Sequence, residues 1–493
     1  MILSSHARAR LLLALALLPA SACASEPAPV TLTQWTPPSA PWVQSDRTHL
    51  RDEAGRVLVF RGVNARVEGI FDVSFDDGRE ALEPIPEFSA ADARRMRELG
   101  MAVLRLPINW SGIEPVQGSY DEAYLDRVQA LVALCAAEGI HVLIDFHQDA
   151  YGKDIGEDGA PLWAIQPPPD MLLEGPLLDL EARRTSEQVL RAFRTFFTDD
   201  DEDTRDVELQ AAFAAMTRHV AARFASEPMV IGYDLYNEPI ASERELWRFH
   251  PRVVAAIREV DTRHLVFFEP AGTRNLLDMA PLSPTPFEDA GGVYAVHLYT
   301  LAFLDPRMEL DTITRERLGP NVERAAREAA RFEVPMFVGE WGIRPDSPGS
   351  ADYVRFMHEL MDEHFASGAV WLWKEDSQGS WGFYDFDEVA GEWVEREQTR
   401  RAHARVRAEA IAGEPIAMTY DAAALSFELR YQGRSDTAPN VIYIPEASDF
   451  APSFEVRCDG VPLEVQPTRD PGTGQVEVLC AGPGERSVTI TGS

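Results

Sequence analysis

Two glutamates in the chain each follow a short apolar segment, in a pattern that suits paired acid chemistry. Glu238 comes after the run 229–235 and directly before Pro239, and Glu340 comes after the run 334–339. Such runs are typical of buried strands in a parallel sheet, and barrel enzymes place reactive groups at the C-terminal ends of these strands. Two carboxyl groups that flank a glycosidic bond can hydrolyse it, one as a proton donor and the other in its ionised form.

The separation of the two glutamates along the chain fits opposite sides of one barrel mouth. They are about 100 residues apart, which corresponds to about three βα units. The alternative is a pair of surface glutamates that follow strands by chance, in a chain with 80 acidic residues. The flanking residues argue against chance, because Asn237 and Pro239 bracket one glutamate and Trp341-Gly342 follows the other.

The segments around these residues predict the α/β class, with a (β/α)8 barrel that is followed by a small antiparallel β-sandwich. Apolar runs that predict the eight strands lie at 57–64, 101–107, 140–146, 229–235, 264–269, 292–298, 334–339 and 369–374. Helical patterns lie between them at 89–99, 121–138, 184–198, 207–224, 243–260, 314–332 and 353–366, with a last helix expected at 396–411. A hairpin at 49–56 precedes the barrel, and short alternating runs after residue 413 predict the sandwich.

Composition limits the partners that the protein can have. The 493-residue chain has a net charge of −34. So acidic a surface repels nucleic acid and anionic lipid, and we expect neither as a partner. No metal-ligand spacing occurs, since the histidines are scattered and Cys-x-x-Cys is absent, and we expect no cofactor. We expect a monomer.

The N-terminus has the features of an export signal. Basic residues precede the short apolar run 11–18, and Ala20-Ser21-Ala22 stands directly before Cys23. This resembles a bacterial lipobox, which would lead to cleavage before Cys23 and lipid attachment to it, although Ala20 stands where such motifs often have leucine. Simple secretion is the alternative. The expected divisions are a signal peptide at 1–22, a flexible tether at 23–41, a barrel at 42–412 and the sandwich at 413–493.

The remaining cysteines have two different expected roles. Cys458 and Cys480 lie close together near the end of an exported chain and can form a disulfide. Cys135 lies within an apolar helical run and is expected to be a buried packing residue.

Several short motifs together resemble glycoside hydrolase family 5, in clan A. They are Arg-Leu-Pro at 105–107, His147, Asn-Glu-Pro at 237–239, His-Leu-Tyr at 297–299, Glu-Trp-Gly at 340–342 and a tryptophan on strand eight. The resemblance covers residues 45–410. Within the family, the segments 145–149, 232–239 and 371–374 and the C-terminal sandwich resemble the endoglycoceramidase branch. That branch releases the intact glycan of a glycosphingolipid by cutting its glucose–ceramide bond.

The resemblance implies a role for each residue of the motifs. Glu238 would be the general acid/base and Glu340 the nucleophile of a retaining double displacement. Arg105 would hold Glu340 ionised and lower its pKa, and Tyr299 would hydrogen-bond the same carboxylate. Structural roles in an ion pair and in core packing are the alternatives for these two. Asn237 would bind the sugar 2-OH.

The same resemblance extends to residues around the expected sugar site. His297 would orient Glu238 or the substrate, unless it is a satisfied core histidine. His147 and Asp149 would bind sugar hydroxyls, with a loop cap as the alternative for Asp149. Trp373 would stack under the sugar ring, Lys374 would reach the sugar, and Trp371 would pack within the barrel. One departure is Arg66, which stands near where this branch has a lysine, and the two side chains differ in geometry.

A substrate with a lipid tail also requires an apolar groove. We expect it to be lined by residues of two long loops, with loop self-packing as the alternative: Leu162, Trp163, Ile165, Met171, Leu172, Leu173, Leu301, Phe303 and Leu304. Other candidate functions are a β-glucosidase for glucosylceramide, steryl or other hydrophobic glucosides, and a family 5 endoglycanase. An inactive glycan-binding lipoprotein is disfavoured, because both glutamates, Arg105 and Tyr299 are present.

Overall fold

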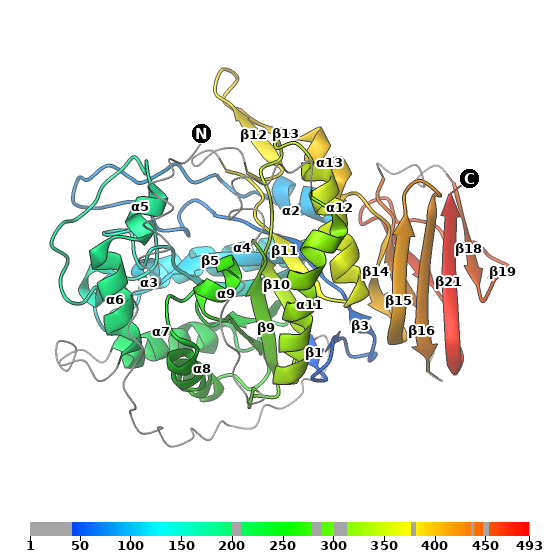
Figure 1. Ribbon diagram of the computed structural model, residues 1–493, viewed down its shortest axis with the longest axis horizontal. Coiled ribbons are helices and arrows are strands. Elements are labelled where there is room, and N and C mark those ends of the chain that lie inside the picture. The colour runs from blue at the N-terminus through cyan, green and yellow to red at the C-terminus, as the bar shows by residue number, and fades with distance from the viewer. Residues whose placement is uncertain are drawn as a thin grey trace.

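The protein contains a closed barrel of eight parallel strands, as the sequence predicts (Figure 1). The structure is a computed structural model that describes residues 42–198, 209–277, 287–299, 313–375, 381–434, 438–446 and 453–492. The barrel strands are β4 (Arg61–Asn64), β5 (Val103–Asn109), β6 (His141–His147), β7 (Val230–Asp234), β8 (Leu265–Phe268), β9 (Gly292–His297), β10 (Met336–Glu340) and β11 (Ser367–Val370). Predictions that concern residues 1–41 and 301–304, and the first two residues of the helix expected at 207–224, lie outside the described residues.

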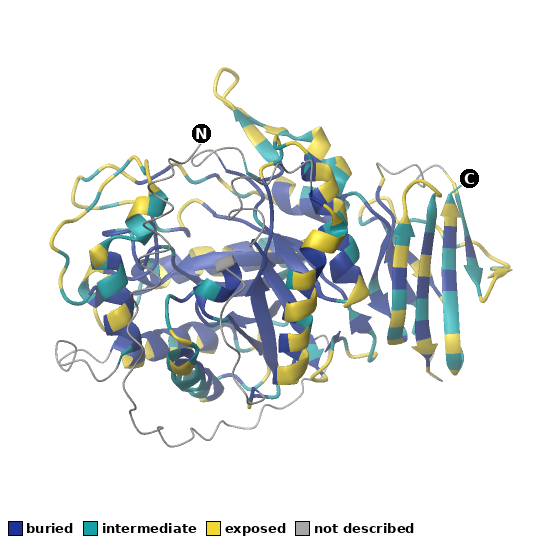
Figure 2. Cartoon of the chain, in the orientation of Figure 1, coloured by how far each residue is buried: buried dark blue, intermediate teal, exposed yellow. Residues whose placement is uncertain are grey.

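Helices cover the outside of the barrel and face it with their buried sides (Figure 2). The main ones are α2 (Ala90–Glu98), α4 (Glu122–Ala137), α6 (Glu187–Phe197), α7 (Leu209–Phe224), α8 (Glu243–Arg258), α11 (Arg315–Phe332) and α12 (Ser350–Glu363). Capping boxes fix where two of them begin, with Ser89 and Asp92 at α2 and Ser242 and Glu245 at α8. Shorter helices in the loops are α3 (Trp110–Ile113), α5 (Leu180–Arg184) and α9 (Gly272–Leu277). Within the described ranges, no helix combines the length and apolarity needed to cross a bilayer.

The barrel interior is apolar at one level and charged at the next. Val103 and Leu143 belong to an apolar cluster inside the barrel, which lies toward the N-terminal ends of the strands. Two residues further along the same strands, Arg105 and Asp145 are fully buried. Because side chains alternate along a strand, these two charges point into the barrel above the apolar layer. A charged layer at the C-terminal ends of the strands is the position that barrel enzymes use for chemistry.

The second unit is a β-sandwich that combines strands from both ends of the chain. One sheet has the order β1-β2-β3-β14-β17-β20 and the other β15-β16-β21-β18-β19, and side chains from both form one apolar cluster. The strands are β1 (Gln44–Ser45), β2 (Leu50–Arg51), β3 (Val57–Leu58), β14 (Arg407–Ile411), β15 (Gly413–Asp421), β16 (Ser426–Gly433), β17 (Asn440–Tyr443), β18 (Phe454–Cys458), β19 (Val461–Pro462), β20 (Gln475–Val478) and β21 (Gly484–Gly492). Buried and exposed residues alternate along β16 (Figure 2).

Three predicted elements differ in the structure. The strand expected at 57–64 is two strands, and the first of them, β3, belongs to the sandwich rather than to the barrel. The helix expected at 396–411 is α13 (Glu397–His403), and β14 follows it. Val406, Ala408 and Ala410 are buried, and so are Arg407 and Ile411, which suits a strand that is covered on both faces. Strand eight ends at Val370, before the tryptophans, and a hairpin of β12 (Tyr384–Asp387) and β13 (Glu392–Glu395) projects from the chain before α13 (Figure 1).

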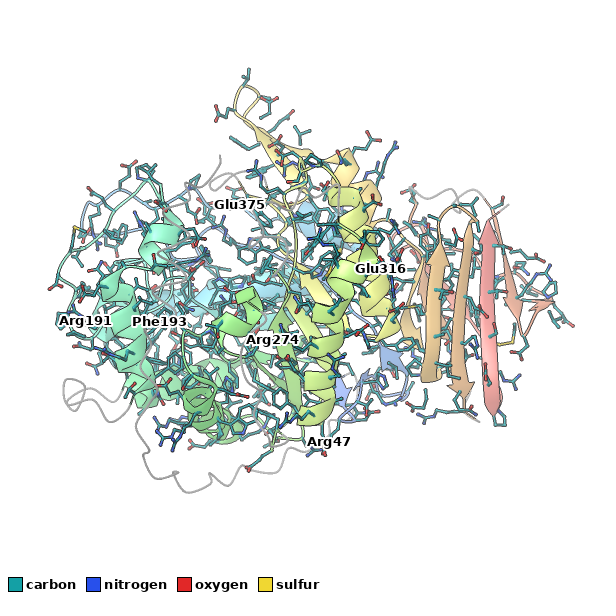
Figure 3. The ribbon with its side chains drawn as sticks, in the orientation of Figure 1. Arg47, Arg191, Phe193, Arg274, Glu316 and Glu375 are labelled. Atoms are coloured by element: carbon teal, nitrogen blue, oxygen red, sulfur yellow. A yellow bond between two sulfur atoms is a disulfide. The ribbon has the colours of Figure 1, made fainter. Side chains whose placement is uncertain are left out.

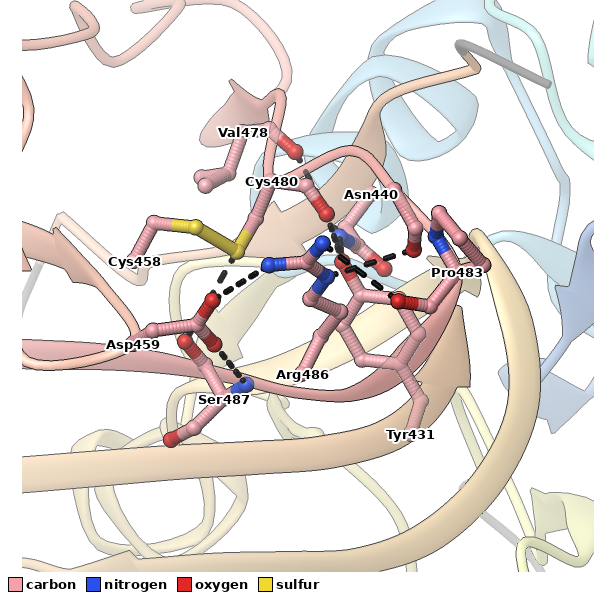
Figure 4. The surroundings of a disulfide bond; sticks show 10 residues. Tyr431, Asn440, Cys458, Asp459, Val478, Cys480, Pro483, Arg486 and Ser487 are labelled. Carbon is pink, nitrogen blue, oxygen red and sulfur yellow. Dashed lines mark hydrogen bonds and ion pairs between the residues drawn. A yellow bond between two sulfur atoms is a disulfide. The ribbon is translucent and has the colours of Figure 1, made fainter. Parts of the chain in front are cut away.

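The disulfide between Cys458 and Cys480 is present, which confirms that pairing, and Cys135 is buried and free (Figure 4). Next to the disulfide, Arg486 donates a hydrogen bond to Asp459 at 2.6 Å. The Tyr431 hydroxyl donates to the carbonyl of Cys480 at 2.7 Å. The disulfide therefore joins the end of β18 to the segment that follows β20.

We expect removal of this disulfide to destabilise the sandwich. The bridge closes a loop with a sequence separation of 22 residues, and the lost restraint on the unfolded chain corresponds to about 3 kcal/mol. Denaturant unfolding of a Cys458→Ser/Cys480→Ser variant would measure the loss. Reducing agent should lower the stability of the parent protein and leave that of the double variant unchanged. Equal stability of the two proteins without reductant would contradict the prediction.

Candidate active site

The two glutamates meet at the C-terminal ends of their strands. Glu340 is the last residue of β10, and Glu238 lies just beyond β7. One carboxylate oxygen of Glu238, one of Glu340 and one ring nitrogen of His297 all lie within 4.8 Å of one another. Retaining glycosidases have carboxyl groups about 5–5.5 Å apart, whereas inverting enzymes separate them by about 6.5–9.5 Å. The short separation fits direct attack by one carboxylate rather than activation of a water between the two.

Glu340 is held by two of its expected partners. Arg105 Nη1 donates to Oε1 at 2.8 Å, and the Tyr299 hydroxyl donates to Oε2 at 3.0 Å. Burial raises the pKa of Glu340, while the charges of His297 and Arg105 lower it, and the net direction is upward. This differs from the lowered pKa expected from Arg105 alone, because the carboxylate is only 5% exposed. The two hydrogen bonds also fix the direction in which the carboxylate points.

Arg105 is the centre of the charged layer and is fully buried. Its guanidinium donors have fixed directions, so they can organise several acceptors at once. Its partners are Glu340, Asn64 (3.1 Å), Asp234 (3.0 Å), Asn237 (2.9 Å), Glu269 (3.0 Å) and Asp145 (3.1 Å). Arg105 therefore contacts Glu340, as predicted, and also forms buried ion pairs with Asp145, Asp234 and Glu269.

Glu238 is connected to the same layer through His297. The ring Nδ1 lies 2.8 Å from Glu238 Oε1 and 3.6 Å from Glu340 Oε2. His297 is fully buried. Burial lowers its pKa, but the charges of Glu269 and Glu340 raise it more, so the net direction is well above the ordinary value. The Nδ1 side of the ring therefore faces both glutamates.

Glu269 is a residue of this site that the sequence analysis missed. It directly follows β8, is 1% exposed and contacts both Arg105 and His297. The sequence contained a signal for it, because Glu269 follows an apolar run and precedes Pro270 in the same pattern that identified Glu238. Asp145 and Asp234, on the neighbouring strands, were also missed as partners of Arg105.

Asn237 and Asp149 are fixed by protein groups. Asn237 accepts from Arg105 and donates through Nδ2 to the backbone carbonyl of Gln148 at 3.0 Å. Both carboxylate oxygens of Asp149 pair with Arg184, and burial, which raises the pKa of Asp149, is outweighed by this charge, which lowers it. The sugar contacts expected of these two residues stay predictions.

Of the two tryptophans after strand eight, Trp373, which was expected at the sugar, is the more buried. Trp373 is 1% exposed, and its Nε1 donates to Asp92 at 3.0 Å, so no face of its ring is free for a sugar. Trp371 is half-buried, and its ring is stacked on His147 with centroids 5.8 Å apart. Lys374 pairs with Asp92 as well. Because the strand ends at Val370, strand alternation does not determine which ring faces the mouth.

Arg66 occupies a buried acidic cluster. It pairs with Glu83, with Glu157 at 3.2 Å and with Glu375 at 2.8 Å, and Glu375 is labelled in Figure 3. All four side chains are at least nine-tenths buried. The guanidinium of Arg66 is thus engaged by carboxylates contributed by three different loops, which is a structural role.

Sequence comparison identifies the family. The family described as "Cellulase (glycosyl hydrolase family 5)" matches residues 74–377, and "Glycoside hydrolase family 5 C-terminal domain" matches residues 405–491. The chain belongs to glycoside hydrolase family 5. Endoglycoceramidase I of Rhodococcus hoagii (strain 103S) is 27% identical over 471 residues, which is 91% of this chain and 88% of the relative.

Solved structures of another relative are similar over their full length. The ganglioside GM3 complex of endo-glycoceramidase II from Rhodococcus sp. has a TM-score of 0.73 at 26% identity, and covers 90% of this chain and 99% of that one. The lactosyl-enzyme intermediate of the same relative has a TM-score of 0.72 at 27% identity, with the same coverage. The protein is therefore a retaining glycoside hydrolase of family 5.

The geometry fits this chemistry without an ion. Among the described residues, Glu238, His297 and Glu340 are close enough to bind a metal as well. In this structure Glu340 accepts hydrogen bonds from Arg105 and Tyr299, and His297 Nδ1 lies 2.8 Å from Glu238 Oε1, so protein groups already contact all three side chains. The roles expected of Glu238 as acid/base and Glu340 as nucleophile use both carboxylates without a metal.

We expect His147 to make the stability of the protein pH-dependent. Burial lowers its pKa, but Asp145, 2.6 Å from Nδ1, and Asp158 raise it more, to about 9. A raised folded-state pKa stabilises the protein below pH 6.5, and this contribution is lost as the pH rises through about 9. For this ring, which is 5% exposed, the contribution is roughly 3 kcal/mol.

The measurement is urea unfolding of the parent protein and of His147→Gln at pH 6.5 and 9.5. The parent should lose more stability than the variant between these two values. A parallel pH dependence of the two proteins would show that His147 does not carry the extra proton.

Proposed function

We propose that the protein hydrolyses the bond between the glycan and the lipid of a glycosphingolipid, as an endoglycoceramidase that releases oligosaccharide and ceramide. Glu340 attacks the anomeric carbon, the bond to the lipid oxygen breaks, and Glu238 gives that oxygen its proton. Water then attacks the anomeric carbon of the glycosyl–Glu340 ester, the bond to Glu340 breaks and frees its carboxylate, and Glu238 accepts a proton from the water. The observation that carries the proposal is the close Glu238–Glu340 pair, with Arg105 and Tyr299 bound to the second carboxylate.

Two observations support a lipid-linked substrate. The similarity to the endoglycoceramidase of Rhodococcus hoagii extends over 91% of the chain. The loop that follows β6 exposes apolar side chains, with Leu162 43%, Met171 62% and Leu172 43% exposed. The three side chains belong to one loop, and exposed apolar side chains that form a contiguous patch mark binding surfaces.

Two other residues of this loop, which were expected to line the lipid groove, are packed inside the protein instead. Ile165 is 1% exposed and belongs to the main apolar cluster. Trp163 packs against that cluster, and its Nε1 donates to the carbonyl of Glu114 at 3.0 Å. These two side chains therefore pack within the protein, so we assign the lipid contact to Leu162, Met171 and Leu172. In place of Trp373, we assign the sugar platform to Trp371.

We also propose an exported, monomeric enzyme. The charged start, the short apolar run and Cys23 support an N-terminal lipid anchor, and simple secretion is the alternative. A disulfide between Cys458 and Cys480 suits an oxidising compartment. Any contact with a membrane would then come from the lipid on Cys23 and from the substrate.

The experiment is product analysis by mass spectrometry. Purified enzyme is given a ganglioside, glucosylceramide, a steryl glucoside and a β-glucan in parallel. Release of an intact oligosaccharide and ceramide from the ganglioside is the expected result. Free glucose from glucosylceramide or from the steryl glucoside alone would favour a lipid β-glucosidase, and cleavage of the β-glucan alone would favour an endoglycanase.

A further inference from the structure

Glu269 is a buried acid whose contacts all lead to the catalytic machinery. Its Oε2 accepts a hydrogen bond from the backbone N–H of Glu238 at 3.0 Å and one from Asn275 at 3.2 Å. Its Oε1 accepts from Arg105 at 3.0 Å and lies 3.1 Å from His297 Nε2. With 1% of its surface exposed, this carboxylate has no route to bulk water. It is too enclosed to touch substrate, so any effect on the reaction passes through its neighbours.

One of these routes is the backbone of Glu238. That residue has a φ of 40°, in the left-handed region that non-glycine residues rarely adopt. Such a conformation persists only where the surroundings enforce it. The hydrogen bond from the Glu238 N–H to Glu269 does this directly, because a carboxylate is a strong acceptor in a low-dielectric site. The backbone conformation of Glu238 determines where its side chain lies at the barrel mouth.

The second route is His297. Glu269 lies at the Nε2 side of the ring and Glu238 at the Nδ1 side. Glu269 Oε1 lies 3.1 Å from Nε2 without hydrogen-bond geometry, so it acts on this nitrogen through its charge, which favours a proton there and leaves Nδ1 to respond to Glu238. Nδ1 then donates to an ionised Glu238 or accepts from a protonated one. Asn275 connects the two parts, since its Oδ1 accepts the backbone N–H of His297 at 3.2 Å.

We propose that Glu269 is a positioning residue for the general acid/base, acting on Glu238 through its backbone N–H and through His297. The inference rests on the proposed function, because it takes Glu238 as the group that protonates the leaving oxygen. It assigns Glu269 to the proton-transfer half of the reaction rather than to the nucleophile, even though Arg105 connects Glu269 to Glu340 as well.

The two halves can be separated by the leaving group of the substrate. An alkyl glycoside, like ceramide, needs a proton on its departing oxygen, whereas a nitrophenyl glycoside departs without one. The value of kcat/KM reports the steps up to the first irreversible bond cleavage, so it isolates this difference. Octyl β-lactoside and nitrophenyl β-lactoside are a suitable pair of probes, or the corresponding glucosides if product analysis finds a glucosidase.

We expect Glu269→Gln to lower kcat/KM for the octyl glycoside by about 10²-fold, the lower end of the range for general acid catalysis. The value for the nitrophenyl glycoside should change by less than about threefold, because that substrate does not use the acid. Loss of both activities to the same extent would overturn the proposal, since it would indicate an effect on Glu340 or on the fold. No loss on either substrate would overturn it as well.

Two further variants show whether the effect is specific to Glu269. Glu328→Gln is the matched control, because Glu328 is also fully buried and ion-paired, to Arg274 at 2.9 Å, and it should leave both activities unchanged. Glu238→Ala should give the same leaving-group pattern as Glu269→Gln. If Glu238→Ala lacks the pattern, the proposed roles fail. If Glu238→Ala has it and Glu269→Gln lacks it, only this inference fails.

Asn275→Ala covers the case in which Glu269→Gln does not fold. The substitution removes one hydrogen bond to Glu269 and one from His297 while the carboxylate stays in place. It should reduce kcat/KM selectively for the octyl substrate, by about threefold or more, given the contribution of a positioned acid. Equal reduction on both substrates would again overturn the proposal.

Discussion

Glu340→Gln should abolish turnover while the protein stays folded. Loss of a catalytic nucleophile reduces kcat by at least about 10³-fold, and often by much more. The amide keeps the shape of the carboxyl group, and its oxygen can still accept from Arg105. Because burial disfavours the charged form of Glu340, the neutral amide should unfold at the same denaturant concentration as the parent protein or a higher one. Hydrolysis of a ganglioside and denaturant unfolding measure the two effects.

A covalent trap gives the positive counterpart of this loss. A fluorinated glycoside that forms a slow glycosyl-enzyme should label the parent protein on the peptide that contains Glu340, as read by mass spectrometry. Glu328→Gln, at a buried acid outside the site, should retain activity and labelling. Undiminished turnover by Glu340→Gln, or a label on another residue, would remove Glu340 from the nucleophile role.

Arg105→Met should cause the largest loss of stability of any single substitution in the barrel mouth. Arg105 is the shared cation of Asp145, Asp234, Glu269 and Glu340, all at least nine-tenths buried. Removing one partner of a buried ion pair costs about 3–5 kcal/mol, because it leaves uncompensated charge in the interior. The free energy of unfolding in urea at pH 8 measures this loss, and activity should be lost with it.

The pH dependence of the stability lost in Arg105→Met tests whether uncompensated buried charge causes the loss. Burial already raises the pKa of Asp234 well above its ordinary value, and loss of Arg105 should raise it further. Acids with a raised folded-state pKa destabilise the protein as the pH rises, so the deficit should be larger at pH 8 than at pH 5. Arg223→Met is the control, since its partners Glu122 and Asp126 are exposed, and it should cost no more than about 1 kcal/mol. A deficit that does not vary with pH would point to lost packing instead.

Most of the barrel could be predicted because its strands carry a strong local signal. A strand covered on both faces is apolar throughout, as β5 and β6 are apart from their functional residues. The sandwich was harder to delimit. Its strand β14 follows a short helix without a turn residue between them, and β3 pairs with a segment that lies at the other end of the chain. No local pattern encodes such a pairing.

Some residues of the candidate site could be predicted from the sequence and others could not. The structure brings together Glu238, Glu340, Arg105, His297 and Tyr299, each of which the motifs had identified. The sequence could not show that Asp149 pairs with Arg184, because that pairing depends on how a long loop folds back. It also could not place Trp371 and Trp373, since the chain leaves the strand before them. Glu269 was detectable and was missed because the pair of glutamates already explained the chemistry.

The pairing of β3 with β14 has a consequence for the order in which the protein folds. Val57 lies opposite Ile411 and Leu58 opposite Ala410 in this antiparallel pair. A ribosome makes about 5–20 residues per second, so the roughly 350 residues between the two strands take tens of seconds to appear. During that time the first strands of the chain have no partner from the other end, and the whole barrel can close before they gain one. The sheet that contains the first residues of the described chain is thus completed only when β20 has been made, roughly 400 residues after β3.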